Sequence, residues 1–256
     1  MKFSVLIPAR YASSRLPAKP LLDIGGKPML EHVYDRAVES GAAQVVIATD
    51  DTRIEQAARA FGAPVCRTAA EHRSGTERLA EAVQRLGFGE DDIVVNLQGD
   101  EPLMPPSLLR QVAENLAANA SAQMATLCTR IHEAGELFDP HAVKVVTDRE
   151  GYALYFSRAV IPWDREAFGV TTEQLPEAAE HYRHLGIYAY RTGFLQEYAA
   201  WPPCDIETME SLEQLRALWN GARIHVAEAL ELPGPGVDTE GDLERVRERF
   251  EELVRR

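Results

Sequence analysis

The sequence is poor in cysteine and has no long apolar run. Cys66, Cys128 and Cys204 are far apart, so no paired spacing indicates a zinc site or a redox dithiol. We therefore expect buried thiols in a reducing compartment, which favours the cytoplasm. The apolar run after Met1 is too short for a signal peptide, and no stretch approaches the roughly 20 apolar residues of a membrane span. A membrane partner is not expected.

Positive charge is also scarce. Asp and Glu number 40 against 27 Lys and Arg, which gives a formal net charge of −13. Such a chain repels a phosphate polymer as a whole, so nucleic acid is not an expected partner, and a bound anion must meet a local group of cations. The length and the ordinary apolar fraction allow one large α/β domain or two small ones, either with a self-sufficient core.

The first half alternates short apolar runs with amphipathic stretches, which is typical of β-α units that build a mostly parallel sheet. The predicted strands of this half are 3–7, 45–49 and 93–97, and the predicted helices are 29–40, 52–61, 76–86 and 105–118. Residues 143–147 and 152–156 flank a polar turn, which predicts an antiparallel hairpin, and 185–190 predicts a further strand. The sheet is therefore expected to be mixed.

The last third adds an apolar stripe, a polar loop and a charged helix. The stripe has helical spacing, which predicts a helix whose apolar face joins the core or a dimer interface. The polar segment 165–180 is the best candidate for a mobile loop, and a tight Pro-Gly connector at 233–236 precedes the final helix. The residues of the stripe are Ile206, Met209, Leu212, Leu215 and Leu218.

The loop after the first predicted strand concentrates the scarce cations. Residues 9–20 carry Arg10, Arg15 and Lys19 and no acidic residue. Ligands of open α/β sheets bind outside the carboxyl ends of the strands, so a nucleoside triphosphate is the natural guest. The loop lacks GxxxxGK[ST] and GxGxxG, which excludes a Walker loop and disfavours a dinucleotide-dependent oxidoreductase. Judged on these residues alone, a solvated surface loop is an equal alternative.

Two aspartates are candidates for a metal site. Asp100 follows the predicted strand 93–97 at the edge where the cationic loop also lies. Magnesium takes one or two carboxylates and completes its shell with phosphate oxygens and water, so Asp100 needs a distant partner. We choose Asp238 as that partner. A turn residue at Asp100 and a plain helix N-cap at Asp238 are the alternatives.

The segments together resemble one known family over nearly the whole chain, the 3-deoxy-manno-octulosonate (Kdo) cytidylyltransferases. The opening loop alone would indicate only the wider sugar nucleotidyltransferase superfamily, which includes CMP-sialic acid synthetases, and the later segments narrow the match. In order, the segments are IPARYASSRLPAKPLLDIGGKPM, HRSGTERLAEA, VVNLQGDEP, AVKVVTD with YALYFSRAVIPWDR, HLGIYAYR, SLEQLR and PGVDTEGDLERVR.

The resemblance implies an α/β three-layer sandwich with a mostly parallel mixed central sheet. This is the Rossmann-like nucleotide-diphospho-sugar transferase fold, with a small antiparallel hairpin and dimerisation region. One domain, 1–256, is expected, in which 1–125 mainly bind CTP, 140–220 mainly bind the sugar and form a homodimer, and 221–256 return to the core.

The resemblance also implies a set of site residues. Arg10, Lys19 and Asp100 would be catalytic, and Asp100 with Asp238 would hold Mg²⁺. Arg forks and a Lys point charge both suit phosphate oxygens. The residues expected to bind CTP are Ala9, Arg10, Ser13, Arg15, Lys19, Arg73, Ser74, Gly75 and Gln98. Those expected to bind the sugar are Gln98, Arg158, His184, Tyr188, Glu213 and Gln214.

Arg158, and as a second candidate His184, would meet the carboxylate of the sugar, while the other sugar-site residues would pair with hydroxyl groups. Without the resemblance, ordinary structural roles are favoured for the last five residues of that set. These roles are a solvated arginine, a core histidine, a packed tyrosine and a polar helix face.

The implied reaction joins CMP from CTP to Kdo with release of pyrophosphate, for lipopolysaccharide synthesis. The alternatives are a cytidylyltransferase for a related acidic sugar, such as sialic acid or an amino-substituted Kdo, and a non-catalytic nucleotide-binding homologue. One departure from the family is Ala18, at a position that is often glycine. Alanine is tolerated there unless the backbone requires a positive φ.

Overall fold

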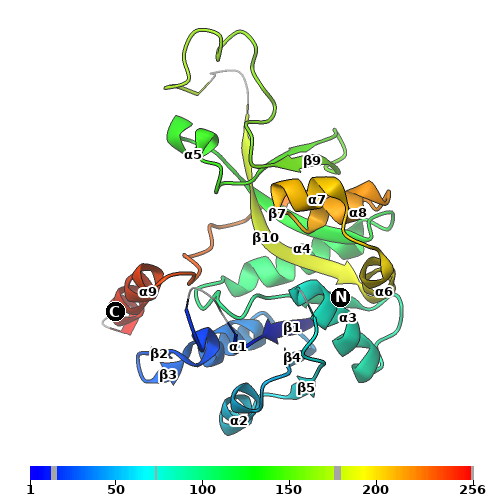
Figure 1. Cartoon of the computed structure of the whole chain (residues 1–256), viewed down its shortest axis with the longest axis vertical. Coiled ribbons are helices and arrows are strands. Elements are labelled where there is room, and N and C mark those ends of the chain that lie inside the picture. The colour runs from blue at the N-terminus through cyan, green and yellow to red at the C-terminus, as the bar shows by residue number, and fades with distance from the viewer. Residues whose placement is uncertain (13–15, 73, 176–179, 255–256) are drawn as a thin grey trace.

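The computed structural model describes residues 1–12, 16–72, 74–175 and 180–254 and centres on a nine-stranded mixed sheet (Figure 1). Seven strands lie in the order β11-β7-β10-β6-β1-β4-β5, and β10 is antiparallel to both of its neighbours on this path. The strands of the path are β1 (Ser4–Ala9), β4 (Gln44–Thr49), β5 (Val65–Arg67), β6 (Ile93–Asn96), β7 (Met124–Arg130), β10 (Tyr182–Arg191) and β11 (Ile224–Glu228). The prediction of a mostly parallel mixed sheet is confirmed.

Helices cover both faces of the sheet and complete three layers. On one face α1 and α4 pack with Val5 and Ile7 of β1, and on the other α3, α6 and α8 pack with Leu6. All six residues of β1 are buried, which explains why apolar residues follow one another from Val5 to Ala9 instead of alternating with polar ones. The helices are α1 (Met29–Glu39), α2 (Thr52–Ala60), α3 (Gly75–Leu86), α4 (Pro106–Ala118), α5 (Ala134–Phe138), α6 (Thr192–Ala200), α7 (Asp205–Glu210), α8 (Gln214–Trp219) and α9 (Glu240–Val254).

The predicted hairpin is confirmed as β8 (Lys144–Thr147) and β9 (Ala153–Ser157), which pair antiparallel. It extends the sheet at one end of the molecule, where β9 and α5 lie far from α2 (Figure 1). β8 pairs with the start of β10, whereas β6 pairs with its end. Residues 185–187 therefore lie on an edge of β10 that is open between β6 and β8, and a bulge occurs there.

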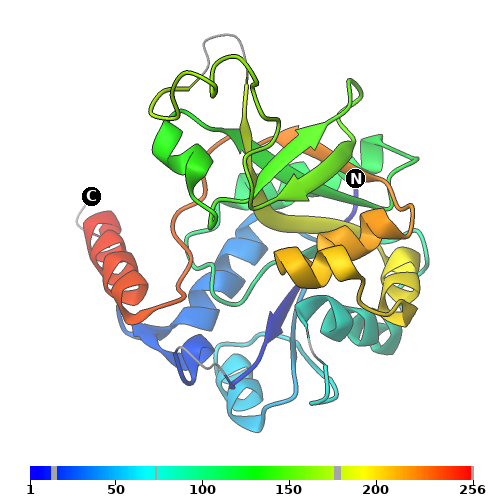
Figure 2. The same cartoon turned by 45° about the horizontal axis from the view of Figure 1, so that its top comes forward.

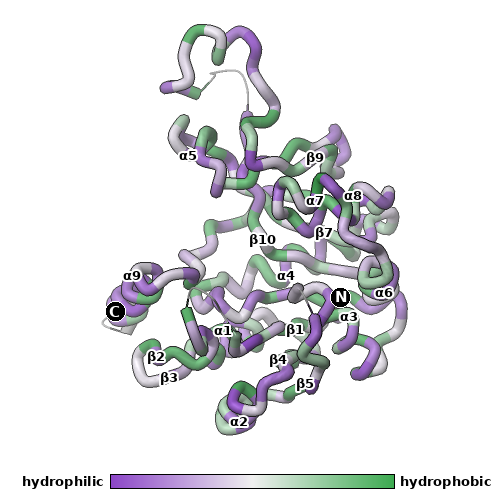
Figure 3. The backbone as a smooth tube through the Cα atoms, viewed as in Figure 1, coloured by the Kyte–Doolittle hydropathy of each residue, from purple (hydrophilic) through white to green (hydrophobic). Residues whose placement is uncertain are grey.

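The final helix packs apart from this hairpin, beside a two-stranded sheet of β2 (Asp23–Ile24) and β3 (Lys27–Pro28) (Figure 2). Leu243 and Val246 of α9 belong to one small core with Ile24, and Phe250 packs against it. Most other residues of the helix are charged (Figure 3). Among the described residues, no helix is long and apolar enough to cross a membrane.

The apolar stripe from Ile206 to Leu218 is not one helix, and that prediction is wrong. The stripe is divided between α7 and α8 because Ser211 adopts a left-handed conformation with φ 52° and ends α7. Leu212 and Leu215 are buried, but Met209 is 83% exposed. Segment 165–180, expected to be mobile, contains Phe168, which packs with Ile131 and Leu137.

Candidate active site

A cavity of about 430 Å³ lies at the carboxyl ends of β1 and β6. Its walls also include the amino-terminal turn of α3 and residues 211–214 between α7 and α8. This is the place in an open α/β sheet where ligands bind. The predicted residues that line it are Ala9, Arg10, Lys19, Ser74, Gly75, Gln98, Asp100, Tyr188, Glu213, Gln214 and Asp238.

The floor of this cavity depends on two glycines packed against Pro8. A Cβ on Gly99 would lie 3.1 Å from the carbonyl oxygen of Pro8, and one on Gly75 would lie 3.3 Å from its Cγ. Side chains at these positions would push β1 away from α3 and from the loop after β6. The glycines thus allow the three segments to converge on one ligand.

Lys19 joins the two aspartates predicted to be metal ligands. Its Nζ lies 2.7 Å from Oδ2 of Asp100 and 3.0 Å from Oδ1 of Asp238. Burial opposes the charge of Lys19, but Asp100 and Asp238 outweigh it and raise the pKa of the amine. The lysine is therefore cationic at neutral pH, and two carboxylates that are 138 positions apart in the chain meet at one cation.

The geometry fits a magnesium ion bound together with phosphates. Among the described residues, no group of three or more His, Cys, Asp or Glu side chains could hold a metal alone. Magnesium, however, needs only one or two carboxylates when phosphate oxygens and water complete its octahedral shell. Asp100 and Asp238 already converge on a positive charge, so they can supply those two ligands.

The structure rejects the simple alternative for Asp238 as an N-cap. α9 begins at Glu240, and the capping residue is Thr239, whose Oγ1 accepts a hydrogen bond from the amide of Asp242. Asp242 in turn accepts a hydrogen bond from the amide of Thr239, which completes a reciprocal cap. The carboxylate of Asp238 is thereby available for Lys19.

The backbone before Lys19 is left-handed. Ala18 has φ 57° and ψ 23° and precedes a short 3-10 helix, Lys19–Leu21. Alanine was expected to be tolerated here unless φ is positive, and φ is positive. A residue with a Cβ is strained in this conformation by about 1–2 kcal/mol relative to glycine. The strained residue directly precedes Lys19, whose amine pairs with both aspartates.

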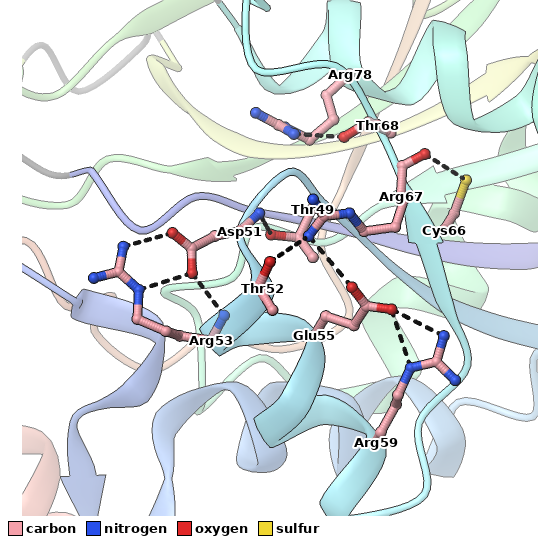
Figure 4. Close-up of polar contacts among 10 residues, drawn as sticks. All are labelled: Thr49, Asp51, Thr52, Arg53, Glu55, Arg59, Cys66, Arg67, Thr68 and Arg78. Carbon is pink, nitrogen blue, oxygen red and sulfur yellow. Dashed lines mark hydrogen bonds and ion pairs between the residues drawn. The ribbon is translucent and has the colours of Figure 1, made fainter.

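Arg78 is a cavity residue that the sequence analysis missed. Its side chain is 5% exposed, and its Nη2 lies 2.8 Å from Oδ1 of Asp50, while Thr68 accepts a hydrogen bond from its Nη1 (Figure 4). These partners follow β4 and β5, so the guanidinium ties their ends to α3. A single arginine in a helix does not change the hydrophobic periodicity, so the pattern did not single out Arg78. Asp50, which follows a predicted strand, was the only sequence feature that pointed to a buried cation.

Asn96 was also missed, because it lies inside the predicted strand 93–97, where a single amide gives no signal of its own. It is 2% exposed, and its Oδ1 has no hydrogen-bond partner among the described residues. The Nε2 of Gln214, which is 6% exposed, is likewise unpartnered within them. Both residues line the cavity. Buried polar atoms left open in this way are suited to bind a polar ligand.

A second cavity, of about 760 Å³, adjoins the first and shares Tyr188, Leu212 and Gln214 with it. It lies along the open edge of β10 and is also lined by His184 and Gly186. Three of the residues predicted to bind the sugar thus line the second cavity, namely His184, Tyr188 and Gln214. Glu213 lines only the first cavity, where its Oε2 accepts a hydrogen bond of 3.0 Å from Thr76.

Arg158 is not brought to either cavity as the structure describes them. Its Nε donates to the carbonyl of Glu210 at 2.7 Å, and its Nη1 donates to the carbonyl of Pro140 at 3.0 Å. These bonds connect the end of β9 to α7 and to the segment after α5. The proposed contact with the sugar carboxylate remains a prediction. Ser13, Arg15 and Arg73, predicted to bind CTP, lie outside the described residues.

The environment of His184 favours its neutral form. Burial lowers the pKa of its imidazole to about 3, so the ring is neutral at physiological pH. A neutral imidazole has one donor and one acceptor, and it pairs well with hydroxyl groups. The residue therefore fits a polyol better than it fits the second role that we expected of it.

Comparison with known proteins gives the family. The model of the cytidylyltransferase family matches residues 4–224. A 3-deoxy-manno-octulosonate cytidylyltransferase of Aeromonas hydrophila is 60% identical over 252 residues, which cover 96% of this chain and 98% of the relative. Its counterpart in Coxiella burnetii is 58% identical over 250 residues, covering 98% and 100%. This chain belongs to the 3-deoxy-manno-octulosonate cytidylyltransferase family.

Solved structures agree with membership of this cytidylyltransferase family. The structure of a CMP:2-keto-3-deoxy-manno-octonic acid synthetase complexed with CTP matches with a TM-score of 0.89 and 45% identity, covering 99% of this chain and 100% of that one. A nucleotidyl transferase from Methanothermobacter, at 16% identity and a TM-score of 0.62, shows the fold alone. The nucleotidyltransferase fold expected from the sequence is thus confirmed.

Proposed function

We propose that the protein transfers CMP from CTP to Kdo in lipopolysaccharide synthesis. The anomeric hydroxyl of the sugar attacks the α-phosphorus of CTP, the bond to the β-phosphate breaks, and pyrophosphate leaves. The observation that carries this proposal is that Lys19, at the end of the cationic loop, forms ion pairs with both Asp100 and Asp238 in the first cavity. The family membership supports both substrates.

The chain contributes positioning and charge rather than covalent chemistry. Lys19 and Arg10 would neutralise phosphate oxygens, and Gln98 lies on the same cavity wall, where it can contact both substrates. Magnesium held by Asp100 and Asp238 would neutralise charge on the phosphates when bound. The second cavity is lined by charged residues such as Glu136 and Arg183 and also by His184, Tyr188 and Gln214. These last three are neutral hydrogen-bonding groups, which suit the hydroxyl groups of a sugar.

The decisive experiment measures pyrophosphate release with each of four nucleoside triphosphates, with and without Kdo and magnesium. We expect release only when CTP, Kdo and the metal are present together. Release with sialic acid or 8-amino-Kdo at a higher kcat/KM than with Kdo would favour the related acidic sugars. No release with any sugar would favour the non-catalytic alternative, provided that CTP still binds.

We further propose that the protein is a homodimer through its hairpin region and acts in the cytoplasm. Leu154 of β9, Met209 of α7 and Trp163 are 62%, 83% and 56% exposed. Large exposed apolar side chains are a common feature of interfaces. Light scattering on the wild type and on Leu154→Asp tests this, and a wild-type monomer at all concentrations would reject the dimer.

A further inference from the structure

Thr126 lies behind His184, on the strand next to it. It belongs to β7, is fully buried, and faces the bulge of β10 between Leu185 and Tyr188. Its Oγ1 lies 2.7 Å from the carbonyl oxygen of Ile187 and 3.0 Å from that of Leu185. The same Oγ1 lies 2.9 Å from Nε2 of His184. One hydroxyl group thus meets two carbonyl groups and one imidazole nitrogen.

The single proton of this hydroxyl group decides the tautomer of His184. Carbonyl oxygens can only accept, and the hydroxyl group has one proton. Pointing it at Leu185 or Ile187 leaves one contact between lone pairs, whereas pointing it at His184 would leave two, so a carbonyl group receives the proton. The hydroxyl oxygen then faces the imidazole as an acceptor, and Nε2 of His184 must be the donor. A neutral ring with a proton on Nε2 has a free lone pair on Nδ1.

The packing around the imidazole keeps it in place. The ring of Phe156 meets it edge to face at 5.0 Å, and the ring of Tyr188 lies at 5.4 Å. Burial favours the neutral form, and His184 lines the second cavity. The orientation of the ring is therefore fixed, and what Thr126 adds is the choice of the nitrogen that carries the proton.

We propose that Thr126 is a positioning residue that fixes His184 as a hydrogen-bond acceptor for a hydroxyl group of the sugar. Through the same hydroxyl group Thr126 holds the bulge that opens the edge of β10 toward the second cavity. The residue touches no substrate itself. This role rests on the proposed function, because it assigns the second cavity to the hydroxyl groups of the acidic sugar.

The first test measures the tautomer directly and needs no activity. In protein labelled with ¹⁵N-histidine, the two ring nitrogens of His184 are assigned by their loss in His184→Gln. We expect a protonated Nε2 and an unprotonated Nδ1 in the wild type and in Thr126→Ser, and a mixed or reversed pattern in Thr126→Val. A proton on Nδ1 in the wild type would overturn the proposal.

The second test measures steady-state kinetics with CTP and Kdo varied separately. We expect Thr126→Val to raise the KM for Kdo about tenfold, because a buried hydrogen bond is lost, and to leave the KM for CTP nearly unchanged. Thr126→Ser should restore the wild-type value. Thr129→Val on the same strand is the matched control, since Thr129 pairs with Arg183 and is not among the contacts of His184.

The outcomes separate this proposal from the proposed function. If the wild type uses Kdo but Thr126→Val keeps both the tautomer and the KM for Kdo, the positioning role is wrong and the function stands. If the wild type shows the expected tautomer but uses no acidic sugar, the function is wrong, and so is the role of His184 toward a sugar. Should Thr126→Val fail to fold, the wild-type tautomer and Thr126→Ser still decide the matter.

Discussion

The proposed nucleotide side, around Lys19, and the α7–α8 pair on the proposed sugar side use charge in opposite ways. On the nucleotide side, Lys19 meets two aspartates at the opening of the cavity, where a ligand or an ion can compete for them. Between α7 and α8 the ion pair is closed: Arg216 of α8 and Glu207 of α7 are 5% and 9% exposed and joined by two hydrogen bonds of 2.8 and 2.6 Å.

This difference matches the chemistry of the expected ligands. A triphosphate and a divalent ion need charged groups that can exchange partners, so the open cluster serves function. A polyol needs neutral donors and acceptors in fixed positions, and the closed ion pair holds the helix that carries Gln214. Breaking the open cluster should therefore affect activity, and breaking the closed pair should affect stability.

The largest effect is expected for Asp100→Asn. Removal of one charge from the cluster should lower kcat by about a thousandfold, because charge on the phosphates is no longer compensated. The free energy of unfolding should change by less than about 1 kcal/mol, since Lys19 is partly open to solvent and keeps Asp238. Parallel assays of turnover and urea unfolding check this, and an active variant would contradict the role of Asp100.

The reverse pattern is expected for Arg216→Met. It leaves the carboxylate of Glu207 buried and unpaired, which should cost about 3 kcal/mol of unfolding free energy. The double variant Arg216→Met/Glu207→Leu should recover most of that loss, because no unpaired charge remains. Urea titrations of the three proteins measure this, and an Arg216→Met protein as stable as the wild type would show that the pair is not structural.

Gly186→Val should weaken only the binding of the sugar. A Cβ at Gly186 would meet no atom within 4 Å, so the fold should tolerate it, but the larger side chain would enter the second cavity. We expect the KM for Kdo to rise about tenfold. A six-carbon 3-deoxy-2-keto acid, whose ring lacks the two exocyclic carbons, should be less affected.

Gly186→Ala and Gly89→Ala form a matched pair for this test, because a Cβ on Gly89 makes only ordinary contact, at 3.6 Å from Asp92. Equal effects of the two alanine variants on the KM for Kdo would contradict binding of the sugar in the second cavity. A tenfold rise in the KM for CTP with Gly186→Val would contradict it as well.

The smallest effect is expected for Ala18→Gly. Relief of the left-handed strain should stabilise the protein, while the greater freedom of glycine in the unfolded chain offsets part of the gain, leaving about 0.5 kcal/mol. Ala43→Gly, where φ is not positive, should instead destabilise. Thermal unfolding of both variants tests this. A loss of stability in Ala18→Gly would show that Ala18 is not strained in the folded protein.

Sequence patterns predicted the framework of the nucleotide side well. Buried parallel strands are continuously apolar, so strands such as 3–7 and 93–97 were recognisable, and the cationic loop and Asp100 follow them directly. Asp238 was chosen as the distant partner of Asp100 and the family resemblance supported that choice, although nothing local relates residues so far apart. Ala18 illustrates the limit: a left-handed residue leaves no periodic mark.

The sugar side was less predictable for physical reasons. The stripe from Ile206 to Leu218 keeps its period across the break at Ser211, so periodicity alone gave one helix instead of two. The bulge of β10 and the hydroxyl group of Thr126 are consequences of strand pairing, which the sequence does not express locally. Arg158 donates to the carbonyl groups of Glu210 and Pro140, which are distant in the sequence, so these bonds also leave no local pattern.

The most direct measurement is the binding of Mn²⁺, followed by electron paramagnetic resonance, with and without CTP. If Asp100 and Asp238 share one ion with the triphosphate, CTP should tighten Mn²⁺ binding in the wild type, and Asp100→Asn and Asp238→Asn should each weaken that ternary complex. Glu240→Gln, next to Asp238 but at the start of α9, is the control. Ternary binding unchanged in both aspartate variants would contradict the shared site.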